Sequence, residues 1–159
     1  SDDPDPADAP MMWEWRFNMK TGAVSESQID DRGSEFPRVP DRLVGLQSRY
    51  GYCLSMGDGG IGGGGERGAT IKYDLSNGGA SEIHNFPVGH FPGEPSFVPA
   101  EGGSNEDDGY LMTYVYAGDT DTSYLVILDA SDISSDPVAE IHIPRRVPTG
   151  FHGTWIADN

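Results

Sequence analysis

The stretch Tyr110-Leu-Met-Thr-Tyr-Val-Tyr116, followed by Ser123-Tyr-Leu-Val-Ile-Leu-Asp129, decides the fold class. Both segments are rich in β-branched and aromatic residues and are bounded by polar residues and glycine, which is typical of strands. The connection between them, Ala117–Thr122, is longer than the tightest hairpin turns. We therefore predict an antiparallel hairpin here.

Short strand-like runs of the same kind recur along the whole chain. No window of about 11 residues or more repeats apolar residues with the helical period, so we expect no helix of consequence. Regular short strands with polar turns are typical of a sandwich, a barrel or a propeller. Besides the hairpin, we predict strands over Trp13–Asn18, Tyr50–Met56, Ala69–Leu75, Glu82–Val88, Ala139–Ile143 and Thr154–Ala157.

The spacing of two β-rich stretches favours the propeller. Met11–Asp31 and Ala69–Val88 each run strand, polar turn, strand, and successive units lie about 50–60 residues apart, near the length of a four-stranded blade. The 159 residues then make about three blades. Three blades cannot close a ring and leave two blade faces uncovered, so we expect the chain to be part of a larger propeller.

Composition excludes several classes of protein. Acidic residues outnumber basic ones by 26 to 10, and the formal net charge of −16 argues against nucleic-acid binding because a phosphate backbone repels such a surface. No apolar run approaches the roughly 18 residues of a membrane span. Residues 1–10 are acidic and rich in proline, which predicts a solvated linker or insertion, with residues 11–159 forming the folded part.

The single cysteine, Cys53, rules out an internal disulfide framework and a cysteine-based zinc site. It lies in an apolar strand-like run, which favours a small buried side chain over a reactive thiol. A reducing cytoplasm is the simplest compartment for it. Aspartate supplies 17 of the 26 acidic residues and lysine only 2 of the 10 basic ones, which suggests a halophilic source as a hypothesis.

Three further motifs favour ordinary loops. The glycine run Gly59–Gly65 contains a formal G-x-G-x-x-G, but no strand and helix frame it, so we expect a surface loop and no nucleotide site. Asp119–Ser123 resembles the start of a calcium loop, yet Tyr124 and Ala130 stand where an EF-hand needs glycine and glutamate. The acidic cluster Asn105–Gly109 is expected to be an exposed turn.

Of the four histidines, His152 has the most suggestive surroundings. It lies in Pro148-Thr-Gly-Phe-His-Gly-Thr-Trp155, where small neighbours let the backbone approach a crowded centre. On these residues alone a structural histidine and a metal ligand both remain open. No histidine has a partner three or four residues away, so none forms a helical metal pair. The other three, for which we expect structural roles, are His84, His90 and His142.

Two glutamates, Glu35 and Glu94, lie in apolar segments stiffened by proline. Pro95 holds Glu94 in extended backbone and so limits where its side chain can point. A carboxylate buried there needs a donor, and the free ring N–H of a metal-bound histidine is one such donor. A plain capping or turn role is the alternative for both.

Five ordered motifs together resemble the C-terminal third of the carotenoid cleavage oxygenase family, which includes stilbene-cleaving enzymes. The resemblance runs from about Met11 to the end of the chain. The motifs are Glu-Phe-Pro-Arg at 35–38, Gly-Glu-Pro-x-Phe-Val-Pro at 93–99, Glu-Asp-Asp-Gly-Tyr at 106–110, Leu-Val-Ile-Leu-Asp-Ala at 125–130 and Val-Pro-x-Gly-Phe-His-Gly-x-Trp at 147–155.

The resemblance implies a seven-bladed β-propeller with a non-haem Fe(II) ion on its axis, bound by four histidines, three of which are oriented by glutamates. His152 matches the last iron ligand, and Glu94 matches the glutamate that hydrogen-bonds it. Glu35 matches a glutamate that supports a histidine upstream of this chain. The other ligands fall outside this chain, and the three remaining histidines do not fall on ligand positions.

The activity implied is cleavage of a conjugated C=C bond of an apolar polyene (a carotenoid or apocarotenoid) or of a stilbene by O2, giving two carbonyl products. The partners implied are this substrate, O2 and the remainder of the propeller, with any membrane contact coming from that remainder; nucleic acid is not expected. We expect the isolated 159-residue chain to be inactive. The alternative is a non-catalytic binding or structural module derived from a propeller. For location we expect the cytoplasm, with attachment at a membrane periphery as the alternative.

Overall fold

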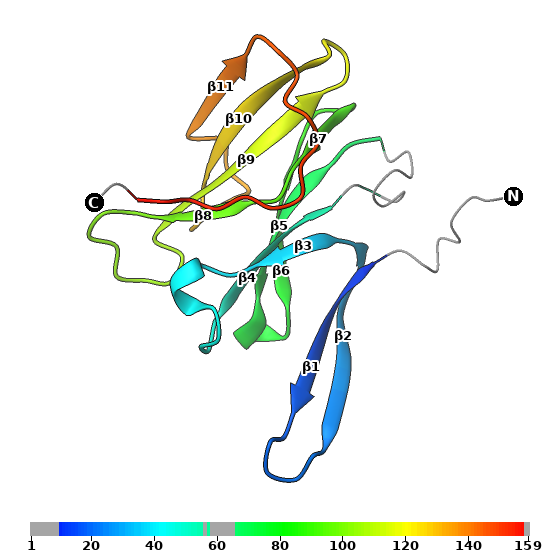
Figure 1. Cartoon of the computed structure of the whole chain (residues 1–159), viewed down its shortest axis with the longest axis vertical. Coiled ribbons are helices and arrows are strands. Elements are labelled where there is room, and N and C mark those ends of the chain that lie inside the picture. Colours follow the sequence, from blue (N-terminus) through cyan, green and yellow to red (C-terminus); the bar gives the residue numbers. More distant parts are fainter. Residues whose placement is uncertain (1–9, 56, 58–65, 158–159) are drawn as a thin grey trace, which may run out of the picture.

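A computed structural model describes residues 10–55, 57 and 66–157. Within these residues the fold is all-β, and the non-strand elements are short 3₁₀ turns such as η2 (Asp41–Leu43) and η4 (Leu75–Asn77). The strands group into three sheets (Figure 1). The glycine run Gly59–Gly65 and nearly all of the expected linker, residues 1–9, lie outside the described residues. In the described part of the chain no helix has the length and hydropathy to cross a membrane.

The first sheet has four antiparallel strands in the order β3-β4-β5-β6. Its central strands are covered on both faces, which explains the buried runs of β4 and β5. Cys53 on β4 is fully buried, as expected of a small apolar side chain. The strands are β3 (Glu35–Arg38), β4 (Tyr50–Ser55), β5 (Ala69–Asp74) and β6 (Ala80–Asn85).

The second sheet contains the predicted hairpin at its centre. β9 (Gly109–Ala117) and β10 (Thr122–Asp129) pair in register from Ala117 with Thr122 to Tyr110 with Asp129, and β11 (Ala139–Ile143) adds to β10. On the other edge of β9, two short strands follow one another, β7 (His90–Pro92) and β8 (Ser96–Pro99). The interruption at residues 93–95 is one of the places that form the site.

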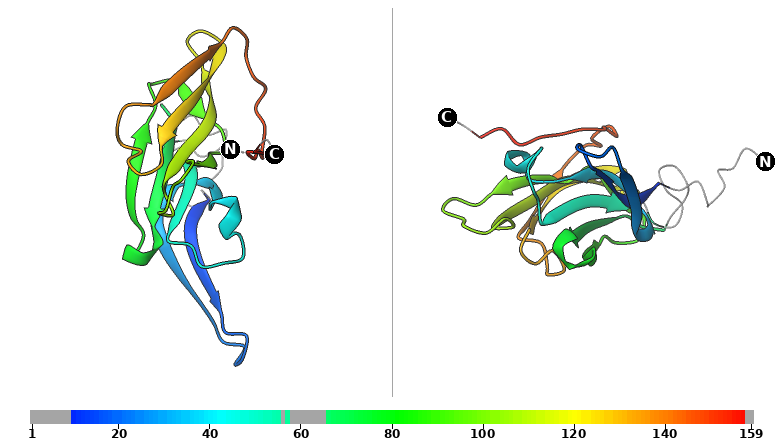
Figure 2. Two further views of the ribbon diagram at one scale, coloured as in Figure 1. Left: turned by 90° about the vertical axis from the view of Figure 1, so that its left-hand side faces the viewer. Right: turned by 90° about the horizontal axis from the view of Figure 1, so that it is seen from below.

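The third sheet is the hairpin of β1 (Met11–Phe17) and β2 (Val24–Gly33), which projects from the body of the molecule (Figures 1 and 2). Aromatic residues alternate along β1 with polar ones, and Trp13, Trp15 and Phe17 are about half exposed. Such alternation is typical of a strand that buries one of its two faces.

The two larger sheets pack against each other through one apolar core. It includes Tyr52 of β4, Phe97 of β8 and Leu111 of β9, and the rings of Tyr52 and Phe97 stack with centroids 5.9 Å apart. Beside this core an ion pair crosses between the sheets: Nζ of the buried Lys72 on β5 lies 2.9 Å from a carboxylate oxygen of Asp107 in the loop before β9. The relative position of the sheets is thus set by packing and by a buried charge pair.

Two expectations from the sequence are wrong. Residues Thr154–Ala157 form no strand, because no neighbouring strand in the described part of the chain offers them a ladder of backbone hydrogen bonds. The acidic cluster before β9 is not merely an exposed turn, since Glu106, Asp107 and Asp108 are half-buried. The Glu106 carboxylate accepts hydrogen bonds from the backbone N–H groups of Arg49 and Tyr50 at 2.7–3.0 Å and so fixes the start of β4.

Candidate metal-ligand site

The site begins with a bulge in β3. Glu35 pairs with Leu54, and Arg38 pairs with Tyr52, so β3 holds one residue more than β4 over this interval. Phe36 takes up the difference with φ of +53°, a left-handed conformation that bulky residues rarely adopt. The bulge thereby directs two side chains of this short strand, Phe36 and Arg38, toward the C-terminal tail.

Glu94 lies in the interruption between β7 and β8. Gly93 is held to β9 on both sides, since its N–H donates to the carbonyl oxygen of Tyr114 at 2.8 Å and its own carbonyl accepts from Thr113 Oγ1 at 2.8 Å. Pro95 is fully buried. With both neighbours fixed, the Glu94 side chain is 4 % exposed. A carboxylate so buried requires hydrogen-bonding partners.

The tail supplies two of these partners. Residues 144–157 run back from β11 past β7 and along β8 without forming a strand (Figure 1, red). Nδ1 of His152 lies 3.1 Å from Oε1 of Glu94, and the N–H of Gly153 donates to Oε2 at 2.8 Å. Because an ionised carboxylate only accepts hydrogen bonds, Nδ1 is the nitrogen that donates in this contact, and in a neutral imidazole the lone pair then lies on Nε2.

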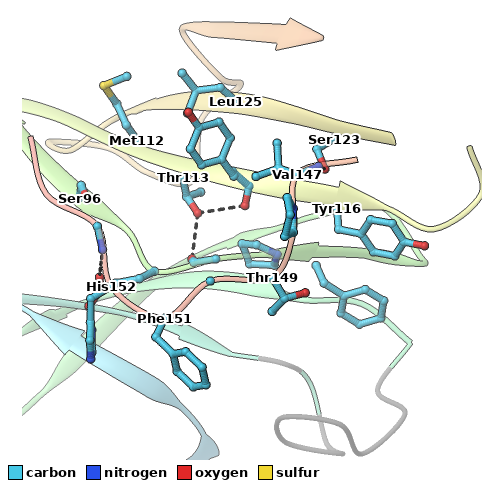
Figure 3. Close-up of a pocket in the computed structure, with 18 of the residues that line it drawn as sticks. Ser96, Met112, Thr113, Tyr116, Ser123, Leu125, Val147, Thr149, Phe151 and His152 are labelled. Carbon is cyan, nitrogen blue, oxygen red and sulfur yellow. Dashed lines mark hydrogen bonds and ion pairs between the residues drawn. The ribbon is translucent and has the colours of Figure 1, made fainter. Parts of the chain in front are cut away.

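The His152 side chain is 75 % exposed, despite its bond to a buried carboxylate. Figure 3 shows the His152 and Phe151 side chains extending from the tail on the side away from Met112 and Leu125. The ring of Phe36 stands edge-on to the imidazole, with centroids 5.5 Å apart at 86°. The imidazole is therefore oriented on two sides and leaves Nε2 available to a ligand outside these residues.

Arg38 and Asp41 complete the network on the side of β3. Nη1 of Arg38 lies 3.2 Å from Oε2 of Glu94 and donates to the carbonyl oxygen of Gly153 at 3.0 Å, while Nη2 bonds Asp41 at 2.9 Å. Asp41 in turn accepts a hydrogen bond of 2.6 Å from the Thr154 hydroxyl. The Thr154 hydroxyl, followed by the Arg38 guanidinium, lowers the pKa of the Asp41 carboxyl below its ordinary value.

Arg38, Asp41, Phe36 and Thr154 were not singled out as site residues from the sequence. The available signal was the position of Arg38 in the motif Glu-Phe-Pro-Arg, together with the requirement of a buried glutamate for a cation. Asp41 and Thr154 lie 113 positions apart, and only the fold brings them together.

Glu35 stands apart from this network. Its side chain is half-buried, and no hydrogen bond or ion pair within the described ranges joins its carboxylate to His152 or Glu94. Its assignment as the support of a histidine outside this chain stays a prediction.

The other histidines make contacts of a structural kind. Nδ1 of His84 lies 3.0 Å from the carbonyl oxygen of Ile133, and Nδ1 of His90 lies 3.1 Å from the Tyr124 hydroxyl. The ring of His142 packs beside that of Tyr124, with centroids 5.9 Å apart.

The pair of His152 and Glu94 has the chemistry of one iron ligand and its supporting carboxylate. A neutral imidazole whose second nitrogen is bonded to a carboxylate is a typical arrangement of a metal-ligating histidine, and imidazole suits iron. His152 and Glu94 fit this arrangement. Within the residues that the structure describes, however, no group of three or more His, Cys, Asp or Glu side chains converges on a metal position. The described residues therefore offer one imidazole in this arrangement, and a metal bound there would need ligands from beyond them.

A groove of about 690 Å³ runs beneath the tail. The tail covers it on one side, and Met112 and Leu125 of the second sheet line the other (Figure 3). Phe151 and His152 also belong to its lining, so the groove adjoins the imidazole.

Comparison with known proteins decides the family. Residues 1–157 match the sequence profile of the family described as Retinal pigment epithelial membrane protein. The chain belongs to this family. Its curated relatives are named carotenoid cleavage oxygenases or dioxygenases, and we refer to it below as the carotenoid oxygenase family.

Two relatives from distant organisms illustrate the match. The chain is 38 % identical over 148 residues to a carotenoid cleavage oxygenase of Mycobacterium tuberculosis, covering 92 % of this chain and 29 % of the relative. It is 32 % identical over 166 residues to carotenoid 9,10(9′,10′)-cleavage dioxygenase 1 of Pisum sativum, with 93 % and 29 % covered. The chain thus spans less than a third of the length of these relatives.

Solved structures of the carotenoid oxygenase family confirm the fold class. A cobalt-substituted apocarotenoid oxygenase of Synechocystis superposes with a TM-score of 0.83 at 33 % identity, over 92 % of this chain and 30 % of the other. The all-β chain is therefore a partial propeller, as expected. Each of its two larger sheets is four strands wide if β7 and β8 are counted as one interrupted strand, and β1 and β2 form a separate two-stranded sheet.

Proposed function

We propose that this chain is the C-terminal part of a non-haem Fe(II) dioxygenase that cleaves a conjugated C=C bond of a carotenoid, an apocarotenoid or a stilbene with O2. The observation that carries the proposal is the bond between Glu94 and His152, which leaves Nε2 of an exposed imidazole free. Family membership supports it, because the curated relatives are named carotenoid cleavage oxygenases. The cobalt-substituted neighbour supports a metal in the site.

The residues of this chain would supply one ligand of the metal site and hold it in place. Glu94 accepts a hydrogen bond from Nδ1 of His152, which would leave Nε2 as the ligating nitrogen and raise its basicity as a ligand. Gly153 donates its N–H to the same carboxylate and so fixes the backbone beside the ligand. Iron, when bound, supplies the redox chemistry by which O2 cleaves the double bond. The remaining ligands and the walls of the substrate tunnel would come from the rest of the propeller.

The test uses a polypeptide of the relatives' length that contains this chain. It is incubated aerobically with an apocarotenoid and, separately, with a stilbene, and the carbonyl products are quantified by chromatography. We expect the unaltered protein to produce two carbonyl products from at least one of these substrates. His152→Ala is expected to abolish the reaction, whereas His142→Ala, a matched change on the exposed strand β11, is expected to retain it.

The outcomes separate the proposal from its alternative. Turnover by His152→Ala at the unaltered rate would refute the assignment of the ligand. If the unaltered protein folds but cleaves neither substrate, the chain serves the alternative role of a binding or structural module, which the single oriented ligand among the described residues would also fit. A cytoplasmic location, with attachment at a membrane periphery as the alternative, stays a prediction.

A further inference from the structure

The buried carboxylate of Glu94 needs a compensating cation, and His152 cannot be that cation when it binds a metal. The carboxylate is 4 % exposed, and a buried ionised carboxylate is costly unless a cation compensates it. A histidine that binds a metal does so as a neutral imidazole. His152 can therefore donate a hydrogen bond to Glu94, but as a metal ligand it contributes no positive charge.

Arg38 is the cation that reaches Glu94. Its Nη1 lies 3.2 Å from Oε2, and among the described residues the ion pairs of Glu94 are with Arg38 and His152 alone. The Arg38 side chain is itself only 22 % exposed, so solvent screens this pair less than a surface pair. Its guanidinium comes from β3 of the first sheet, whereas Glu94 lies in the second.

The guanidinium also binds the backbone next to the ligand. Nη1 donates to the carbonyl oxygen of Gly153, while the N–H of that residue donates to Glu94. Nη2 is held by Asp41 at 2.9 Å, which fixes the plane of the guanidinium. Arg38 thus contacts both the carboxylate that orients the imidazole and the peptide group that follows it.

We propose that Arg38 is a positioning residue for His152: it pairs with the buried carboxylate of Glu94 and anchors Gly153, so that the imidazole is held against Glu94 with Nε2 left available. This role rests on the proposed function, in which His152 binds the metal. Lysine would replace it only in part, because an ammonium is a point charge and cannot bridge the carboxylate, the Gly153 carbonyl and Asp41 as the planar fork does.

The experiment is solution NMR, without added metal and at a pH well above the ordinary pKa of histidine, on a polypeptide of the relatives' length that contains this chain. Two signals are read: the ¹⁵N shifts of the His152 ring, which report the nitrogen that carries the proton, and the exchange rate of the Gly153 amide. The variants are Arg38→Gln and Arg38→Lys. The matched control is Arg49→Gln, because Arg49 pairs with Asp74 away from the site.

In the unaltered chain we expect His152 to be protonated at Nδ1. Arg38→Gln should change the ¹⁵N shifts of the His152 ring, because the carboxylate that accepts from Nδ1 loses its cation, and should speed Gly153 amide exchange about tenfold, the scale of one lost hydrogen bond to a charged group. Arg38→Lys should recover more than half of the change in the ring, because it restores the charge. Arg49→Gln should change neither signal by more than about twofold.

A further variant separates positioning from simple attachment of the tail. Asp41→Asn weakens the contacts of Asp41 with Thr154 and Arg38 but leaves the contact between Arg38 and Glu94 in place. We expect the His152 ring signals of Asp41→Asn to stay close to those of the unaltered chain. The proposal is overturned if Asp41→Asn matches Arg38→Gln, if Arg38→Lys recovers nothing, or if Arg38→Gln leaves the ring unchanged in a folded chain.

These outcomes do not depend on oxygenase activity. If the ring and amide signals respond as expected but no carotenoid or stilbene is cleaved in the activity test, the positioning role stands and the proposed function fails. If cleavage is observed but the His152 ring signals do not change in Arg38→Gln, the proposed function stands and the positioning role of Arg38 fails.

Discussion

The buried ion pair between Lys72 and Asp107 offers the sharpest test of how the two sheets are held. Nζ of Lys72 lies 2.9 Å from the Asp107 carboxylate, 3.3 Å from the carbonyl oxygen of Ser131 and 4.4 Å from the ring centroid of Tyr50. At an effective dielectric constant of about 20, two charges at this separation attract by about 6 kcal/mol before desolvation is counted. Asp107→Asn removes this attraction and leaves a buried ammonium whose other carboxylate partner, Glu82, is farther away at 3.9 Å.

We expect Asp107→Asn to cost about 3 kcal/mol in the free energy of unfolding. This is the low end of the range for removing one partner of a buried pair, because the contacts of Lys72 with Glu82, Ser131 and Tyr50 remain. For a chain of this length the melting temperature should fall by about 6–12 °C. The double variant Lys72→Met with Asp107→Asn should recover most of the loss, since methionine keeps the apolar stem and no charge is then buried.

The assay is urea denaturation followed by circular dichroism, with Arg16→Gln as the control because Arg16 and its partner Glu14 are exposed. A cost below about 1 kcal/mol for Asp107→Asn, or a double variant no more stable than the single one, would refute the reasoning. Either result would mean that apolar packing alone sets the position of β3 and its arginine relative to Glu94.

Three further predictions concern single positions. Burial raises the pKa of the Cys53 thiol to about 12, so a disulfide reagent at about pH 8 should label it only after denaturation; rapid labelling of the folded chain would contradict this. Hydrogen bonds, first from Arg49 and then from Ser76, lower the pKa of Asp74, so its contribution to stability is present above the unfolded pKa and is lost as the pH falls; Asp74→Asn should flatten the acid side of the stability curve, and an unchanged slope would speak against the contact. A methyl group added at Gly109 would meet the carbonyl oxygen of Val98 at 2.4 Å and the ring of Phe97 at 2.6 Å, so Gly109→Ala should cost about 1–3 kcal/mol, measured by the same denaturation, and an unchanged midpoint would show that β8 can shift.

The fold was largely predictable where strands are long and patterned. The strands of the central hairpin, β9 and β10, combine β-branched residues with alternation, and both appear within about a residue of their expected bounds. The short strand β3 was missed, because four residues with a proline and a bulge carry little pattern. The error at Thr154–Ala157 has the opposite cause: the segment has strand-like residues, but strand formation needs a partner, which no local pattern supplies.

Of the residues that form the candidate site, only Glu94 and His152 were predicted from the sequence, through the motifs in which they lie. The bond between Glu94 and His152 agrees with the pairing that the resemblance implied, although the assignment of His152 to iron stays a proposal. Arg38 was not predicted as a site residue, because its role depends on its contact with Glu94 in another sheet, and no local sequence pattern indicates that contact. The left-handed Phe36 was equally hidden, since its backbone conformation is imposed by the bulge and is unusual for its residue type.

Whether His152 binds iron is best measured by the iron content of a polypeptide of the relatives' length that contains this chain. We expect about one Fe(II) per chain, with affinity lost in His152→Ala, lowered about 10–100-fold in Glu94→Gln and retained in His142→Ala. If His152→Ala binds iron as tightly as the unaltered protein, His152 is not an iron ligand.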